Sequence, residues 1–131
     1  MESRKGRKVL ILIVDDFEAN RELTSFILSN EGFQVDSASD GQGGLDKTFQ
    51  LRPDLIILDL SLPDMSGWEV LRRLKSDDQT KNIPIIVLTA HWPEQLEPEA
   101  GCERLLTKPC LPDRLVAEVA AVLKNRQSAT A

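Results

Sequence analysis

Short apolar runs alternate with amphipathic stretches along most of the chain. Segments rich in Val, Ile and Leu predict five strands, at 8–16, 33–38, 54–59, 83–90 and 104–109. Apolar residues at helical spacing between and after them predict helices at 17–32, 40–52, 67–77 and 111–126. Strands that are apolar throughout and alternate with helices are typical of a parallel sheet covered on both faces. The pattern therefore predicts an α/β fold.

Three of these predicted helices have a definite apolar face, whereas the helix predicted at 40–52 is weaker. The residues on these faces are Ala19, Leu23, Phe26, Ile27 and Asn30 in 17–32, Val70, Leu71 and Leu74 in 67–77, and Leu115, Val119, Val122 and Leu123 in 111–126. Gly32 and Pro112 suit a helix end and a helix start. The segment 40–52 contains three glycines, which lower its helix propensity.

Length and charge limit the number of domains and the kind of partner that the chain can bind. A chain of 131 residues suits one domain with one core. We expect a polar tail at 1–7, which carries the basic residues Arg4, Lys5 and Arg7, a domain at 8–126, and a short tail at 127–131. The net charge of −5 weighs against direct binding of nucleic acid, which favours basic surfaces.

No feature indicates a membrane, secretion or a thiol-based site. No apolar run reaches the roughly 20 residues that span a bilayer, and no signal peptide opens the chain. These observations predict a cytoplasmic protein with no membrane insertion. Cys102 and Cys110 fit neither a CxxC nor a zinc-site spacing, so we expect free thiols.

Polar residues end four of the predicted strands. Asp15 and Asp16 end the first, Asp59 the third, Thr89 the fourth and Lys108 the fifth. Taken singly, each suits a helix cap, a turn or a solvated charge. In a parallel sheet, however, the carboxyl ends of the strands meet at one edge, where ligands bind. The sequence therefore predicts that these side chains converge.

Their chemistry points to phosphoryl transfer. Clustered carboxylates require a cation, and oxygen ligands suit Mg²⁺ or Mn²⁺. A metal, a lysine and a hydroxyl together can hold a phosphoryl group. A carboxylate is already ionised at neutral pH, so Asp59 would act as a nucleophile without a general base.

Four motifs resemble the receiver domain of two-component response regulators. They are "VDD" at 14–16, "LDLSLPDMSG" at 58–67, "LTA" at 88–90 and "TKP" at 107–109, in the family's order. The resemblance covers residues 8–126. It implies a flavodoxin-like fold with strand order 2-1-3-4-5.

The resemblance also implies roles for these residues. Asp59 would be the phosphoacceptor, and the metal would be held by Asp15, Asp16, Asp59 and the backbone carbonyl of Ser61. The donor would be a phosphohistidine on a histidine kinase or histidine phosphotransfer protein. Output would be a changed affinity for an unknown partner protein, through a shift between two conformations.

Further positions would act in switching and tuning. By the same resemblance, Lys108 would pair with Asp59 and then with a phosphoryl oxygen. Thr89, with Ala90 beside it, would provide the switch hydroxyl, and the Lys108–Pro109 peptide would be cis. In receivers, the residue at the position of His91 flanks the phosphoryl group and tunes hydrolysis of the phosphoaspartate. His91 would either have that role or be an ordinary exposed loop residue.

Two departures from the family pattern stand out. Leu105 occupies a position that is often aromatic, so the usual coupling of threonine to an aromatic ring is lost. The segment 91–103 is about one helical turn short and contains Pro93 and Pro98. We therefore expect the family's fourth helix, which would lie in 91–103, to be short or irregular. The output face would then be altered beside an intact phosphorylation site.

Three functions compete at this point. The first is a phosphorylatable receiver without an output domain in this chain, as in a stand-alone regulator, a relay shuttle or part of a longer protein. The second is a pseudo-receiver that binds partners without phosphorylation. The third is a phosphatase with an aspartate nucleophile, which requires a DxD motif after the first strand where this chain has Asp15 and Asp16 adjacent. The intact acidic residues and lysine favour the first, a protein that is not a conventional enzyme.

Overall fold

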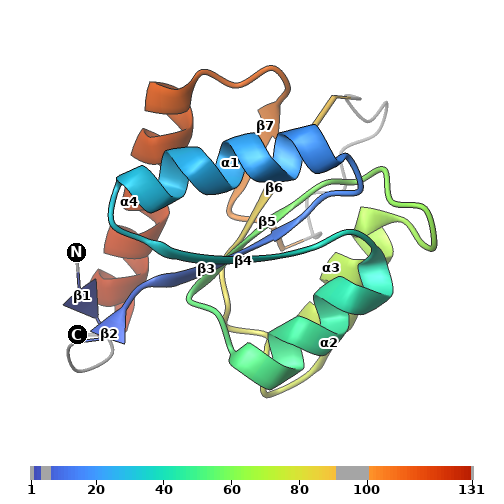
Figure 1. The fold of residues 1–131 in the computed structure, drawn as a ribbon. Coiled ribbons are helices and arrows are strands. Elements are labelled where there is room, and N and C mark those ends of the chain that lie inside the picture. The colour runs from blue at the N-terminus through green and yellow to red at the C-terminus, as the bar shows by residue number, and fades with distance from the viewer. Residues whose placement is uncertain (1, 4–6, 91–100, 131) are drawn as a thin grey trace.

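The computed structural model describes residues 2–3, 7–90 and 101–130 (Figure 1). Its strands are β1 (Glu2–Ser3), β2 (Arg7–Lys8), β3 (Leu10–Val14), β4 (Gln34–Ala38), β5 (Leu55–Leu58), β6 (Ile85–Thr89) and β7 (Arg104–Thr107). Its helices are α1 (Glu18–Asn30), α2 (Gly41–Leu51), α3 (Gly67–Ser76) and α4 (Pro112–Thr130). The five parallel strands run in the order β4-β3-β5-β6-β7, which confirms the predicted flavodoxin-like order 2-1-3-4-5.

Helices cover both faces of this sheet. Figure 1 shows α1 and α4 on one face and α2 and α3 on the other. Alternate strand residues point to opposite faces, so β3 divides its apolar side chains between the two layers. Ile11 and Ile13 pack toward the α1 and α4 side, whereas Leu12 and Val14 pack toward α2 and α3. This double burial explains why the central strands are apolar throughout.

The strand register brings the polar strand ends to one edge. Val14 lies opposite Leu58, and Thr89 lies opposite Thr107. The chain therefore leaves β3, β5, β6 and β7 at one rim of the sheet. The backbone continues this pairing beyond β5, since the amide of Asp59 donates to the Val14 carbonyl at 2.9 Å.

The buried face of α1 differs from the predicted one. Leu23 is 59% exposed and Phe26 is 65% exposed, although both belong to the apolar face expected from the sequence. Ala19 and Asn30 of the predicted face are exposed as well, and only Ile27 is half-buried. The side that faces the sheet carries Ile27 together with fully buried Leu28 and half-buried Thr24. Apolar spacing located the helix but not its rotation, because polar residues share the buried side.

The other two predicted helix faces are confirmed. Val70, Leu71 and Leu74 of α3 are buried, and so are the four predicted residues of α4. The weaker predicted helix at 40–52 is also regular, as α2, in spite of its glycines. Asp40 caps α2 by accepting a hydrogen bond from the amide of Gly43 at 2.7 Å. Gly44 lies directly against Val14 of β3, so the glycines permit close packing where larger residues would not fit.

The ends of the chain carry more regular structure than expected. The predicted tail at 127–131 is largely helical, because α4 continues to Thr130. Within the predicted tail at 1–7, β1 pairs with β2 in an antiparallel arrangement. The predicted short or irregular fourth helix falls mainly on 91–100, outside the described residues. Among the helices that the structure describes, none has both the length and the apolar character needed to cross a membrane.

Candidate functional site

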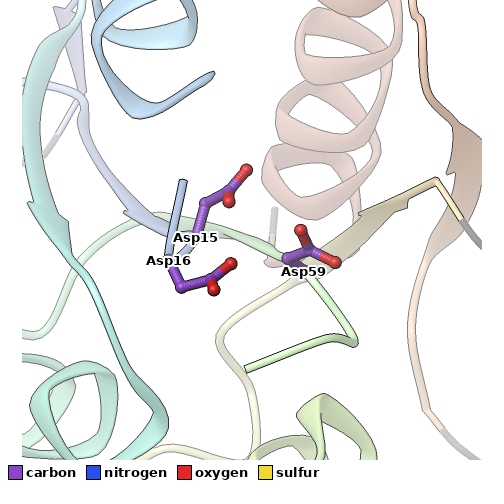
Figure 2. Close-up of side chains that lie close together, drawn as sticks. All are labelled: Asp15, Asp16 and Asp59. Carbon is purple, nitrogen blue, oxygen red and sulfur yellow. The ribbon is translucent and has the colours of Figure 1, made fainter. Parts of the chain in front are cut away.

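Three carboxylates meet at the carboxyl edge of the sheet. Asp15 and Asp16 follow β3, and Asp59 follows β5. One oxygen from each lies within 4.8 Å of the other two (Figure 2). Asp15 and Asp59 are buried, with 5% and 7% exposure, whereas Asp16 is exposed. The predicted convergence of these three side chains is present in the structure.

Lys108 connects two of these carboxylates. Its Nζ lies 2.7 Å from Asp15 Oδ2 and 2.8 Å from Asp59 Oδ2. Partial burial lowers the pKa of Lys108, but the hydrogen bonds and charges of Asp15 and Asp59 outweigh burial, and the pKa is raised. The ammonium therefore stays charged at neutral pH and balances part of the acidic cluster.

Backbone amides hold the two buried carboxylates in place. Asp15 Oδ1 accepts a hydrogen bond from the Phe17 amide at 2.9 Å, and Asp59 Oδ1 accepts one from the Ser61 amide at 3.1 Å. The Asp15 amide itself donates to the Ala38 carbonyl at 3.1 Å. Each carboxylate thus has one oxygen bound to its own loop and the other bound to Lys108.

The donor set fits a hard divalent cation. Three carboxylate oxygens within 4.8 Å of one another, one of them on an exposed residue, match the ligands and partial hydration that Mg²⁺ prefers. Ser61 lies on the exposed loop two residues beyond Asp59. Since Lys108 contacts both Asp15 and Asp59, a cation at this position would share their oxygens with the ammonium.

Thr89 and Lys108 adjoin at the neighbouring strand ends. Thr89 is the last residue of β6 and is fully buried, and the Lys108 amide donates to its carbonyl at 2.8 Å. Ala90 follows and is exposed. The Lys108–Pro109 peptide is cis, as expected.

Comparison with known proteins decides the family. A family model described as the response regulator receiver domain matches residues 11–120. The chain belongs to this family. The polar-differentiation response regulator DivK of Brucella anthropi is 34% identical over 116 residues, which cover 86% of this chain and 94% of that protein.

Longer relatives and a solved structure agree with this assignment. The phosphate regulon transcriptional regulatory protein PhoB of Pseudomonas aeruginosa is 42% identical over 118 residues, which cover 88% of this chain and 52% of PhoB. The chain thus spans about half the length of that relative and of others like it. The crystal structure of a CheY-like receiver domain protein from Methanospirillum hungatei JF-1 superposes with a TM-score of 0.89. It is 28% identical and covers 94% of this chain and 99% of its own.

Of the remaining predicted positions of this receiver domain, one is described by the structure and one is not. Leu105 lies on β7 opposite Val87 and is half-buried. His91 lies outside the described residues. The roles predicted for Thr89, Ala90, His91, Leu105 and Pro109 stay predictions, because position alone does not assign them.

Sequence reasoning missed two residues that contact this region of the receiver. Arg21 of α1 donates through Nη1 to the Asp15 carbonyl at 2.8 Å. Asp64 accepts hydrogen bonds from the amino end of α2 while lying on the loop that follows Asp59. Asp64 stands within the "LPDMSG" motif, but its spacing from 41–42 carries no signal, because the contact depends on how α2 packs.

Proposed function

We propose that this receiver takes a phosphoryl group from a phosphohistidine donor onto Asp59, with Mg²⁺ bound beside it. The observation that carries the proposal is the meeting of Asp15, Asp16 and Asp59 with Lys108 bridging two of them. Asp59 is buried to 7% exposure, yet it lies at the open carboxyl edge of the sheet beside exposed Asp16. A carboxylate in this position combines restricted motion with access from one side.

The proposed reaction forms one bond and breaks another. An oxygen of Asp59 attacks the phosphorus, and the phosphorus–nitrogen bond to the donor imidazole breaks, leaving its electron pair on that nitrogen. The product is an aspartyl phosphate. Asp59 Oδ1 is held by the Ser61 amide, so Oδ2, which contacts Lys108, is the oxygen we assign to the attack.

Metal binding is assigned to the carboxylates and to one backbone group. Asp15, Asp16 and Asp59 would hold Mg²⁺, together with the carbonyl of Ser61. The bound ion supplies charge stabilisation for the transferring phosphoryl group. Lys108 supplies a second positive charge once it exchanges an aspartate oxygen for a phosphoryl oxygen.

Thr89 is the residue we assign to conformational switching. It is fully buried and adjoins Lys108 through the backbone, so a hydroxyl movement toward the phosphoryl group would displace the end of β6. Receiver domains of response regulators interact with histidine kinases and output partners. We propose a protein partner here, because the net charge of −5 weighs against direct binding of nucleic acid by these residues.

Intact mass spectrometry after incubation with acetyl phosphate and Mg²⁺ tests the proposal. One phosphoryl adduct is expected on the wild-type chain and none on Asp59→Ala or in the presence of a chelator. Asp78→Asn is the matched control, since Asp78 is a highly exposed carboxylate, with 92% side-chain exposure, that should not be modified. It should still give one adduct.

The two ways of failing have different meanings. An adduct that survives Asp59→Ala would refute the assignment of the phosphoacceptor. A missing adduct calls for beryllofluoride binding, because a rapidly hydrolysed aspartyl phosphate escapes detection by mass. Failure of both would refute phosphorylation and favour the pseudo-receiver, an interaction module that acts without it.

A further inference from the structure

The loop that follows Asp59 is fixed at its far end by close packing. Gly67 begins α3, and its amide donates to the Leu60 carbonyl at 2.9 Å. A methyl group on Gly67 would overlap the carbonyl oxygen of Asp59 and lie 2.7 Å from Leu60 Cα. The loop from Leu60 to Ser66 therefore leaves and rejoins the fold at nearly the same point.

The outer part of this loop is held by a different contact. Asp64 Oδ1 accepts a hydrogen bond from the Gly41 amide at 2.7 Å, and Oδ2 accepts one from the Gln42 amide at 2.9 Å. Both amides belong to the first turn of α2, where backbone N–H groups have no partner within the helix. One carboxylate thus joins the loop to a helix that lies 22 to 23 positions earlier in the chain.

Packing reinforces this contact. Met65, the next residue, is partly buried and packs against the apolar cluster between the sheet, α2 and α3. It lies so close to Gly41 that a Cβ there would overlap Met65 Cγ and lie 2.9 Å from its Sδ. Asp64 and Met65 together hold the loop against the amino end of α2.

We propose that Asp64 is a positioning residue for the phosphoacceptor site. Its carboxylate fixes the 60–66 loop on α2, and the loop in turn fixes Ser61 beside Asp59. This inference rests on the proposed function, because it concerns the metal contact assigned there to the Ser61 carbonyl. Without Asp64, the loop keeps its attachment at Gly67 and the packing of Met65 but loses both hydrogen bonds to α2. Ser61 lies between the loosened segment and Asp59.

Mn²⁺ binding to the unphosphorylated protein tests the role directly, with free Mn²⁺ counted by electron paramagnetic resonance. Asp64→Ala is expected to raise the Mn²⁺ Kd about tenfold, the loss typical when a group supporting a metal ligand is removed. Asp64→Asn keeps a side-chain acceptor for one of the two amides but removes the charge. Its Kd should lie nearer to wild type than to Asp64→Ala.

Asp40→Ala is the matched control. Asp40 also caps α2, through the Gly43 amide, and also carries one negative charge, but within the described part of the structure its side chain bonds to α2 and not to the 60–66 loop. Both alanine variants should lower the thermal stability of the fold, because both remove a cap from the same helix. Only Asp64→Ala should change the Mn²⁺ Kd by more than about twofold.

Each result decides between positioning and its alternatives. The inference is overturned if Asp64→Ala binds Mn²⁺ as wild type does, or if Asp40→Ala weakens binding equally, which would reduce Asp64 to a helix cap. It is also overturned if Asp64→Asn and Asp64→Ala have the same Kd, because charge alone would then explain the loss. A wild-type chain that binds no Mn²⁺ would instead count against the proposed function, and the inference would fall with it.

Discussion

Gly67→Ala provides a sharp test of how tightly the loop after Asp59 is packed. The added methyl group would overlap the backbone oxygen of Asp59 and lie 2.7 Å from Leu60 Cα. Carbon atoms pack best at about 3.5–4.0 Å, so the methyl group is about 1 Å too close to main-chain atoms. Main chain cannot rotate away as a side chain does. The substitution must therefore shift the segment that carries Asp59, the proposed phosphoacceptor.

The expected cost follows from two opposing terms. Overpacking typically costs about 1–3 kcal/mol, and a contact with backbone belongs at the upper end. Replacing glycine by alanine in a helix gains at most about 1 kcal/mol. Gly67→Ala should therefore lower the free energy of unfolding by about 2 kcal/mol, and phosphoryl acceptance should fall with the displacement of Asp59.

Gly41→Ala is the matched comparison. Gly41 also begins a helix directly after its capping residue, and a Cβ there would also overlap a neighbour. The closest neighbour is the Met65 side chain, which is flexible and can move to another rotamer, and Val70 Cγ2 lies farther away at 3.1 Å. The free energy of unfolding should change by less than about 1 kcal/mol.

Urea denaturation followed by circular dichroism would measure both variants. Two-state transitions with equal m-values would let the midpoints be compared as free energies. Equal losses for Gly67→Ala and Gly41→Ala would refute the distinction between backbone and side-chain contacts. A Gly67→Ala protein as stable as wild type would show that the loop can move without cost.

Two further expectations follow from burial and charge. Leu74→Ala should lower the free energy of unfolding by about 2–5 kcal/mol, because Leu74 is buried to 1% exposure. Leu23→Ala should lower it by less than about 0.5 kcal/mol, because Leu23 is 59% exposed. Urea denaturation would compare the two variants, and equal losses would contradict the orientation of α1. Hydrogen bonds from the Gln42 and Gly41 amides lower the pKa of Asp64 below 3.8, so its stabilising effect should be present above that pH and disappear as the pH falls through the lowered value. The stability difference between wild type and Asp64→Asn should therefore shrink on acidification, and a difference independent of pH would show that charge on Asp64 does not matter.

The sheet and the acidic cluster were predictable because they depend on patterns that can be recognised along the amino-acid sequence. β3, β5 and β6 are buried on both faces, so their sequences are apolar throughout and their ends are sharply marked by Asp15, Asp59 and Thr89. Parallel topology then fixes where those ends meet. The order of the strands came from the family resemblance, since periodicity does not contain it.

Features that depend on packing between elements were not predictable. The buried side of α1 includes Thr24 beside Ile27 and Leu28, so hydrophobicity alone pointed to the wrong rotation. The contact of Asp64 with Gly41 requires the position of α2 relative to the loop, which no local pattern specifies. Spacing in the sequence could identify candidate ligands on strand ends, but not residues that hold a loop in place.

The charges at the site suggest why metal and phosphoryl group would act together. Three carboxylates and one ammonium leave two negative charges uncompensated, which is the charge of one divalent cation. Lys108 already contacts Asp15 and Asp59, so a bound cation must compete with it for their oxygens, and this competition should keep metal affinity modest. Phosphorylation replaces the single charge of the Asp59 carboxylate by the larger negative charge of the phosphoryl group, about −1.5 to −2, and offers Lys108 new phosphoryl oxygens. The lysine can then leave Asp15, and the competition is relieved in the phosphorylated state, so metal binding and phosphorylation should favour each other.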